Sequence, residues 1–138
     1  MADSTATCKL ISDSDTYTGK QALDYETGIS KQSAGAEAIC MHRLVIPPGG
    51  KGKAHLHEGH ETAIYVLSGE AGMWYGENLE HDMRAKAGDY VYIPAGMPHL
   101  PYNVSDTEAV VAVLARTDPN EQESIELRPD LDNVHHQS

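Results

Sequence analysis

The sequence of 138 residues contains few cysteines and no long apolar segment. Its two cysteines, Cys8 and Cys40, are too few for a disulfide framework, and their spacing does not fit a zinc ribbon. Buried free thiols are the simpler interpretation. A chain of this length is typical of one domain, which can bury most of its apolar surface without covalent cross-links.

Basic residues are also scarce, because 10 Lys and Arg stand against 21 Asp and Glu, for a net charge of −11. An acidic surface repels phosphate backbones and anionic lipid, so we expect neither nucleic acid nor membrane as a partner. The first residues lack the basic start and apolar run of a signal peptide, and no stretch is long enough to span a membrane. Together with the low cysteine content, these absences predict a cytoplasmic protein.

Helix signals are weak, because no long stretch shows a 3.6-residue apolar period. Short β-rich runs are instead separated by Gly and Pro, and residues 38–46 end at two prolines and two glycines that cannot continue a paired strand. Strands spaced about every 8–12 residues are typical of a sandwich or barrel. The expected strands are 8–12, 38–46, 54–57, 61–67, 71–75, 81–86, 90–93, 100–104 and 109–115, with an edge strand at 125–127.

This pattern predicts three segments in a single all-β domain. Residues 1–37 form an N-terminal arm with the first strands, residues 38–117 form the barrel core, and residues 118–138 form a polar, acidic tail. We expect most of the tail outside its edge strand to pack loosely.

The first chemical signal is the pair His55 and His57. Successive side chains of a strand point to opposite faces, so both imidazoles share a face. Glu61 opens the next strand, and a carboxylate on a neighbouring antiparallel strand can reach such a pair. Two neutral histidines and a carboxylate suit iron, manganese, nickel, copper and zinc. The same spacing alone also fits a polar sheet face without a metal.

A second group of patterned residues lies in residues 88–103 and is more specific than the histidine pair. Here the chain resembles the cupin superfamily, whose second motif reads G, five residues, PxG, two residues, H, three residues, N. Its first motif reads G, five residues, HxH, three or four residues, E, six residues, G. The matching residues are Gly49, His55, His57, Glu61 and Gly69 for the first motif, and Gly88, Pro94, Gly96, His99 and Asn103 for the second.

The first motif departs from the family at one point. Seven residues separate Glu61 from Gly69 where the family has six, and counting back from Gly69 places Thr62 in the ligand position. A β-bulge would restore Glu61 to the inner face. His60 has the parity of Thr62 and is the alternative, which would give a four-histidine site. We favour Glu61, because its distance from His57 is the family's own.

The resemblance implies a cupin-type jelly-roll barrel, or double-stranded β-helix, that holds one divalent metal ion inside. The implied ligands are His55, His57, Glu61 and His99, and the ion is Fe, Mn, Zn, Ni or Cu. Small members of the superfamily are dioxygenases, decarboxylases, isomerases or polyketide cyclases, so we expect a metal-dependent enzyme for a small organic substrate. A non-catalytic binding protein and a metal-free enzyme similar to sugar epimerases are the alternatives. The resemblance also implies a homodimer, and it assigns no catalytic residue.

The pocket lining is predicted from the apolar and aromatic residues near the motifs. Arg43 shares a face with Met41 and Val45, and an inward Arg43 would suit an anionic substrate. In that arrangement His42 faces solvent. The expected lining is Arg43, Tyr65, Trp74, Tyr92, Met97 and Tyr102.

Overall fold

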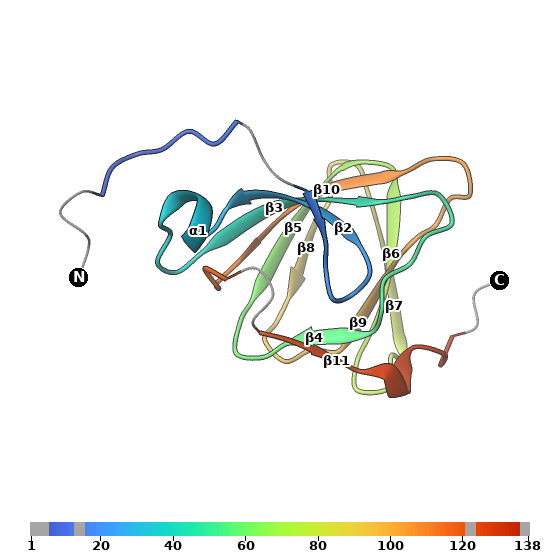
Figure 1. The fold of residues 1–138 in the computed structure, drawn as a ribbon. Helices are drawn as coiled ribbons and strands as arrows, with labels where there is room; N and C mark the ends of the chain where they lie inside the picture. The colour runs from blue at the N-terminus through green and yellow to red at the C-terminus, as the bar shows by residue number, and fades with distance from the viewer. Residues whose placement is uncertain (1–5, 13–15, 121–123, 136–138) are drawn as a thin grey trace.

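The computed structural model describes residues 6–12, 16–120 and 124–135, and these residues form two antiparallel sheets that enclose a barrel interior (Figure 1). Within them the first sheet has the strand order β1-β2-β3-β10-β5-β8, and the second has the order β11-β4-β9-β6-β7. The first sheet comprises β1 Thr16–Thr18, β2 Asp24–Ile29, β3 Cys40–Ile46, β10 Val110–Arg116, β5 Thr62–Ser68 and β8 Tyr90–Ile93. The second comprises β11 Ile125–Leu127, β4 His55–His57, β9 His99–Asn103, β6 Glu70–Tyr75 and β7 His81–Lys86.

The jelly-roll prediction is confirmed, and most of the expected strands agree with the structure to within a residue at each end. The strand expected at residues 8–12 is wrong, because these residues have no regular structure. The structure adds a short helix, α1 Lys31–Ala34, and a 3₁₀ turn at Pro129–Leu131. Both are too short to produce an apolar period in the sequence.

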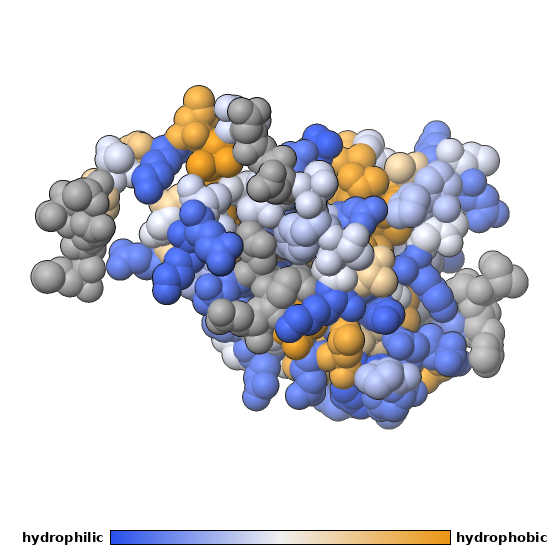
Figure 2. Space-filling model, viewed as in Figure 1, coloured by the Kyte–Doolittle hydropathy of each residue, from blue (hydrophilic) through white to orange (hydrophobic). Residues whose placement is uncertain are grey.

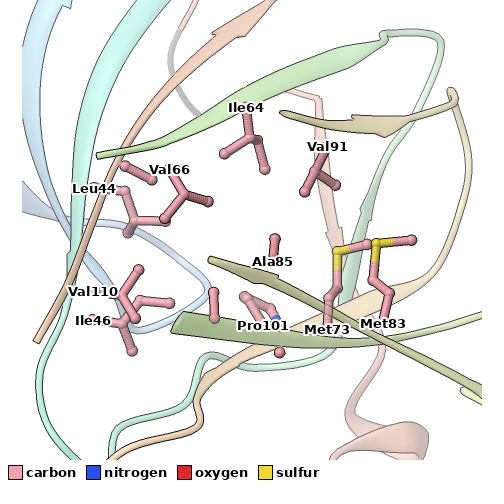
Figure 3. Close-up of a pocket in the computed structure, with 13 residues that line it drawn as sticks. Leu44, Ile46, Ile64, Val66, Met73, Met83, Ala85, Val91, Pro101 and Val110 are labelled. Carbon is pink, nitrogen blue, oxygen red and sulfur yellow. The ribbon is translucent and has the colours of Figure 1, made fainter. Parts of the chain in front are cut away.

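Alternation along β3 and β10 builds the first face of the interior. Leu44 and Ile46 of β3 are buried, and they lie opposite Ala112 and Val110 of β10. With Ile64, Met73 and other apolar side chains they surround a cavity of about 50 Å³ between the two sheets, shown in Figure 3. This half of the barrel interior is entirely apolar in its lining.

A second cluster of buried side chains stabilises the other side of the second sheet. Leu131 of the 3₁₀ turn packs with Ala54, Leu79 and Leu100, and the Ala54 amide donates to Asp132 Oδ1 at 2.7 Å. These contacts fix the strands β4 and β9 from outside the barrel, and both strands carry motif histidines.

The surface agrees with the acidic composition. Figure 2 shows one face that is mostly hydrophilic, with hydrophobic side chains gathered in separate patches. Among the described helices, none has both the length and the apolar character needed to cross a membrane.

Candidate metal centre

Three histidines from two neighbouring strands meet inside the barrel. β4 directs His55 and His57 to one face, and the register pairs His55 with His99 at the start of β9. One potential ligand atom from each side chain lies within 4.8 Å of the other two. Only 2% of His55, 3% of His57 and 4% of His99 is exposed, so these three residues, the histidine cluster, lie in the interior.

Backbone carbonyls fix the orientation of two of these rings. His55 Nδ1 lies 2.7 Å from the Lys53 carbonyl oxygen, and His99 Nδ1 lies 2.9 Å from the Met97 carbonyl oxygen. A carbonyl only accepts, so each Nδ1 carries the proton and each Nε2 keeps its lone pair. Metal-binding histidines usually have this tautomer, with the other ring nitrogen donating a hydrogen bond to a backbone carbonyl or a carboxylate.

Burial keeps the cluster neutral. Desolvation lowers the pKa of His99 to about 4 and also lowers the pKa of His55 and of His57. The charge of Arg116 lowers all three pKa values further, as the second largest cause at His57. Neutral imidazole is the form that binds a metal, so the protons need not be displaced at pH 7.

The cluster fits a divalent ion by the chemistry of its donors. His57 Nδ1 is buried and has no hydrogen-bond partner among the described residues. Three buried, neutral imidazoles with converging nitrogens would be costly polar groups in an apolar interior unless they had a partner. Imidazole sites of this kind accept Fe, Mn, Ni, Cu and Zn, with the remaining positions open to water or substrate.

Glu61 does not join the cluster in the structure. Its carboxylate is exposed and accepts a hydrogen bond from the Tyr92 hydroxyl. The alternation of β5 places Thr62 inside the barrel and Glu61 outside. A register shift does occur in β5, at its far end, where Val66 and Ser68 pair with consecutive residues of β10, but it does not turn Glu61 inward as expected. At that position it leaves the face of Glu61 unchanged.

His60, the alternative fourth ligand, is also directed elsewhere. Its Nδ1 lies 2.6 Å from the Thr117 carbonyl oxygen, and its Nε2 lies 3.8 Å from an Asp118 carboxylate oxygen. The group of potential metal ligands found among the described residues therefore contains three histidines and no carboxylate.

Thr62 occupies the interior position that the family's spacing from Gly69 assigns to the carboxylate. Its hydroxyl oxygen accepts a hydrogen bond of 3.0 Å from Nε of Arg116, which pairs with Thr62 across β5 and β10. Only 5% of Arg116 is exposed. Sequence reasoning missed Arg116, although its spacing from Val110, Ala112 and Leu114 places it on the inner face of β10.

The expected inward Arg43 is corrected by the structure. Its side chain is 51% exposed and lies 3.9 Å from Glu26, while His42 is buried at 2% exposure with both ring nitrogens unpartnered among the described residues. The buried residues of β3 are the even-numbered ones, Cys40, His42, Leu44 and Ile46. Arg43 and the other odd-numbered residues therefore face outward. Cys40, Leu44 and Ile46 are apolar and would have indicated this inner face, but the polar His42 among them favours the opposite assignment.

The aromatic residues expected in the pocket lie outside the apolar cavity. Tyr65 packs on Tyr90 with ring centroids 4.8 Å apart, and Tyr92 is exposed. Trp74 stacks on Tyr102 at 6.1 Å and packs against the second hydrophobic cluster. Met97 contributes its carbonyl to the orientation of His99. The cavity is instead lined by apolar residues of seven strands, among them Met73 and Pro101.

Comparisons with known sequences agree with this fold and site. A family model described as a cupin domain matches residues 42–115, more than half of the chain. The oxalate-binding protein of Thermotoga maritima is 30% identical over 90 residues, which are 65% of this chain and 72% of that protein. Oxalate oxidase 1 of Hordeum vulgare is 30% identical over 80 residues, which are 54% of this chain and 40% of that protein.

Solved structures show the same fold. An oxalate decarboxylase of Lactobacillus farciminis, in complex with formate, superposes with a TM-score of 0.68 at 20% identity over 83% of this chain. The Bacillus subtilis oxalate decarboxylase, described with Mn(II) centres, gives a TM-score of 0.64 at 22% identity over 72% of this chain. The chain spans 33% and 26% of those two proteins, so the likeness concerns the barrel alone.

Proposed function

This chain belongs to the cupin family, and we propose that it is a metal-dependent enzyme that holds one divalent ion through His55, His57 and His99 and acts on a small organic substrate. The observation that carries the proposal is the buried histidine cluster, with Nδ1 of two rings bonded to backbone carbonyls and the Nε2 lone pairs left free. Burying three imidazoles costs free energy, and a bound metal ion would offset that cost.

Each part of the site has a role in the proposed activity. The bound ion supplies a Lewis acid that polarises a substrate oxygen, or a redox centre. His55, His57 and His99 hold it at a fixed position inside the barrel. The lining of the apolar cavity of about 50 Å³ includes Pro101, which lies two residues from His99 along β9. Its apolar lining disfavours water there, and its volume has room only for a small organic group.

Manganese and oxalate are the first metal and substrate to test. The Thermotoga maritima relative is an oxalate-binding protein, and the Bacillus subtilis structure is described with Mn(II) centres. Both relationships support a small oxygen-rich acid as the substrate class. Oxalate also chelates metals through two carboxylate oxygens, which suits an ion with three protein ligands and open positions.

Binding without turnover is the second candidate. It is favoured by the lack of a general acid or base beside the histidine cluster among the described residues. No Asp or Glu among the described residues joins the histidine cluster, so a carboxylate that could move a substrate proton is not in place there. The Thermotoga maritima relative is named for binding rather than for a reaction.

One assay separates the two candidates. Manganese-loaded and iron-loaded protein is incubated with oxalate under air, and formate, carbon dioxide and hydrogen peroxide are measured beside equilibrium binding of oxalate. Turnover that disappears after chelation and in His99→Ala supports the enzyme. Metal-dependent binding with no product supports the binding protein. Neither binding nor turnover with oxalate or other small carboxylates in the metal-loaded protein contradicts both.

A further inference from the structure

Arg116 is a buried cation whose charge acts on all three histidines of the cluster, and no carboxylate of the described residues forms an ion pair with it. The guanidinium of Arg116 has no Asp or Glu oxygen within 4.0 Å in the part of the chain that the structure describes. Its Nε donates to Thr62, a neutral partner. A buried charge is costly unless an opposite charge or several hydrogen bonds compensate it.

The groups whose pKa values respond to the charge of Arg116 are neutral at pH 7. Desolvation is the largest cause that lowers the pKa of His42 to about 4 and raises the pKa of Tyr25 to about 12, and the charge of Arg116 acts on both groups. Its charge also reaches the three cluster histidines. The charge of Arg116 is therefore felt by five neutral polar side chains, and the carboxylate of Glu61 lines the same pocket without forming an ion pair with it.

A divalent ion in the cluster would add to this imbalance. In the family motif the acidic ligand brings one negative charge to the metal, but this chain has Thr62 at the interior position and Glu61 on the outer face. With three neutral histidines, the ion and Arg116 would together bring three positive charges into a buried site. These positive charges are partly offset if the ligand that enters the site is itself an anion.

We infer that Arg116 and Thr62 form an anion subsite in which a carboxylate of the substrate takes the place of the family's acidic metal ligand. This inference rests on the proposed function and names the substrate class and a specificity-determining residue for it. The planar guanidinium of arginine suits this role, because it can donate two parallel hydrogen bonds to one carboxylate while Nε remains on Thr62.

Arg116→Gln tests the subsite, with Arg43→Gln as its matched control. Both variants remove one arginine from the first sheet, but Arg43 is exposed on the outer face. Oxalate is titrated calorimetrically into manganese-loaded protein after the manganese content of each variant has been measured. We expect Arg116→Gln to bind manganese at the wild-type stoichiometry and oxalate at least tenfold more weakly, while Arg43→Gln stays within twofold of wild type. Oxalate affinity of Arg116→Gln within threefold of wild type would overturn the inference.

Thr62→Glu provides a second test if Arg116→Gln does not fold. The new carboxylate would occupy the proposed anion position, so manganese should bind more tightly and oxalate at least tenfold more weakly than in wild type. Unchanged oxalate affinity in this variant would also overturn the inference.

The same titrations distinguish the failure of the subsite from the failure of the metal proposal. If wild-type protein takes up no manganese, the proposed function fails, and oxalate is titrated into the metal-free protein instead. Binding there that depends on Arg116 would still support the subsite. No binding in the metal-free wild-type protein would overturn the subsite together with the proposed function.

Discussion

A one-residue difference in strand parity separates Glu61 from Thr62, and it decides which side chain faces the histidine cluster. Glu61 is exposed and accepts a hydrogen bond from Tyr92, whose pKa is raised chiefly by that bond. Thr62 is buried against Arg116. The choice of fourth ligand in the family's motif is thus a question of side-chain direction, and in this chain the carboxylate points away from the interior.

Glu61→Gln should leave metal binding unchanged. The substitution removes a charge from the surface without altering the cluster, so we expect manganese affinity within twofold of wild type. Manganese binding is measured by the loss of the free-ion signal in electron paramagnetic resonance. His57→Ala, measured alongside, should lose at least a hundredfold in affinity, because it removes one of three donors. A similar loss in Glu61→Gln would show that Glu61 is a ligand after all.

The three cluster histidines could be predicted from the sequence, but the residues around them could not. Alternation places His55 and His57 on one face, and the spacing of the second motif points to His99. Sequence reasoning places Arg43 and His42 on the wrong faces, because polar and apolar residues occur on both sides of β3 and polarity does not choose between them. Arg116 is the last residue of β10, and the other inward-facing residues of that strand are apolar. Apart from its spacing, the sequence therefore gives no sign that this arginine is buried in the interior.

At the level of elements, the turn between β5 and β6 depends on Gly69. This residue has φ of 82°, and a Cβ there would lie 2.5 Å from the Ala109 carbonyl oxygen. Gly59, in the turn between β4 and β5, has a similar φ of 76° but nothing within 4 Å of the position of a Cβ. The two glycines share a backbone conformation and differ in their surroundings.

Gly69→Ala should therefore destabilise the protein more than Gly59→Ala. Both substitutions cost about 1 kcal/mol for a left-handed backbone, and Gly69→Ala costs roughly 1–3 kcal/mol more because it clashes with the backbone of a neighbouring segment. Urea unfolding followed by circular dichroism measures the free energy of unfolding of both variants. Equal losses would contradict the contact at Gly69.

The positions of most strands along the sequence could be predicted, since Gly and Pro bound almost every run. Asn103 of the second motif shows why a motif residue need not belong to the site. Its Nδ2 donates to the carbonyl oxygens of Ile46, Pro47 and Glu108, so it joins the ends of β3 and β9 to the segment before β10. Hydrogen bonds to three backbone carbonyls depend on the tertiary fold, and spacing alone does not reveal them.

For the whole molecule, the buried histidines predict that stability depends on pH in mildly acidic solution. His42 and His99 have folded-state pKa values of about 4, below the ordinary value of 6.5. Between these values the unfolded chain binds protons that the folded chain excludes, so the free energy of unfolding falls as the pH is lowered. Each residue contributes about 3 kcal/mol over the full interval.

Urea unfolding of metal-free protein between pH 7.5 and 5.5 measures this effect before most carboxylates titrate. We expect the free energy of unfolding to decrease steadily below about pH 6.5. His42→Gln should flatten the profile, and the exposed control His81→Gln should leave it unchanged. A profile that is flat in wild-type protein would mean that the interior accepts charged histidines.

His55, His57 and His99 should hold one divalent metal ion without help from Glu61. Elemental mass spectrometry of untagged protein, purified without chelators and reloaded with manganese, tests it most directly when wild type, Glu61→Gln, His99→Ala and the exposed control His81→Ala are measured together. We expect about one metal ion per chain in wild type, Glu61→Gln and His81→Ala, and almost none in His99→Ala. Equal metal content in His99→Ala and wild type, or no metal in wild type after reloading, would contradict it.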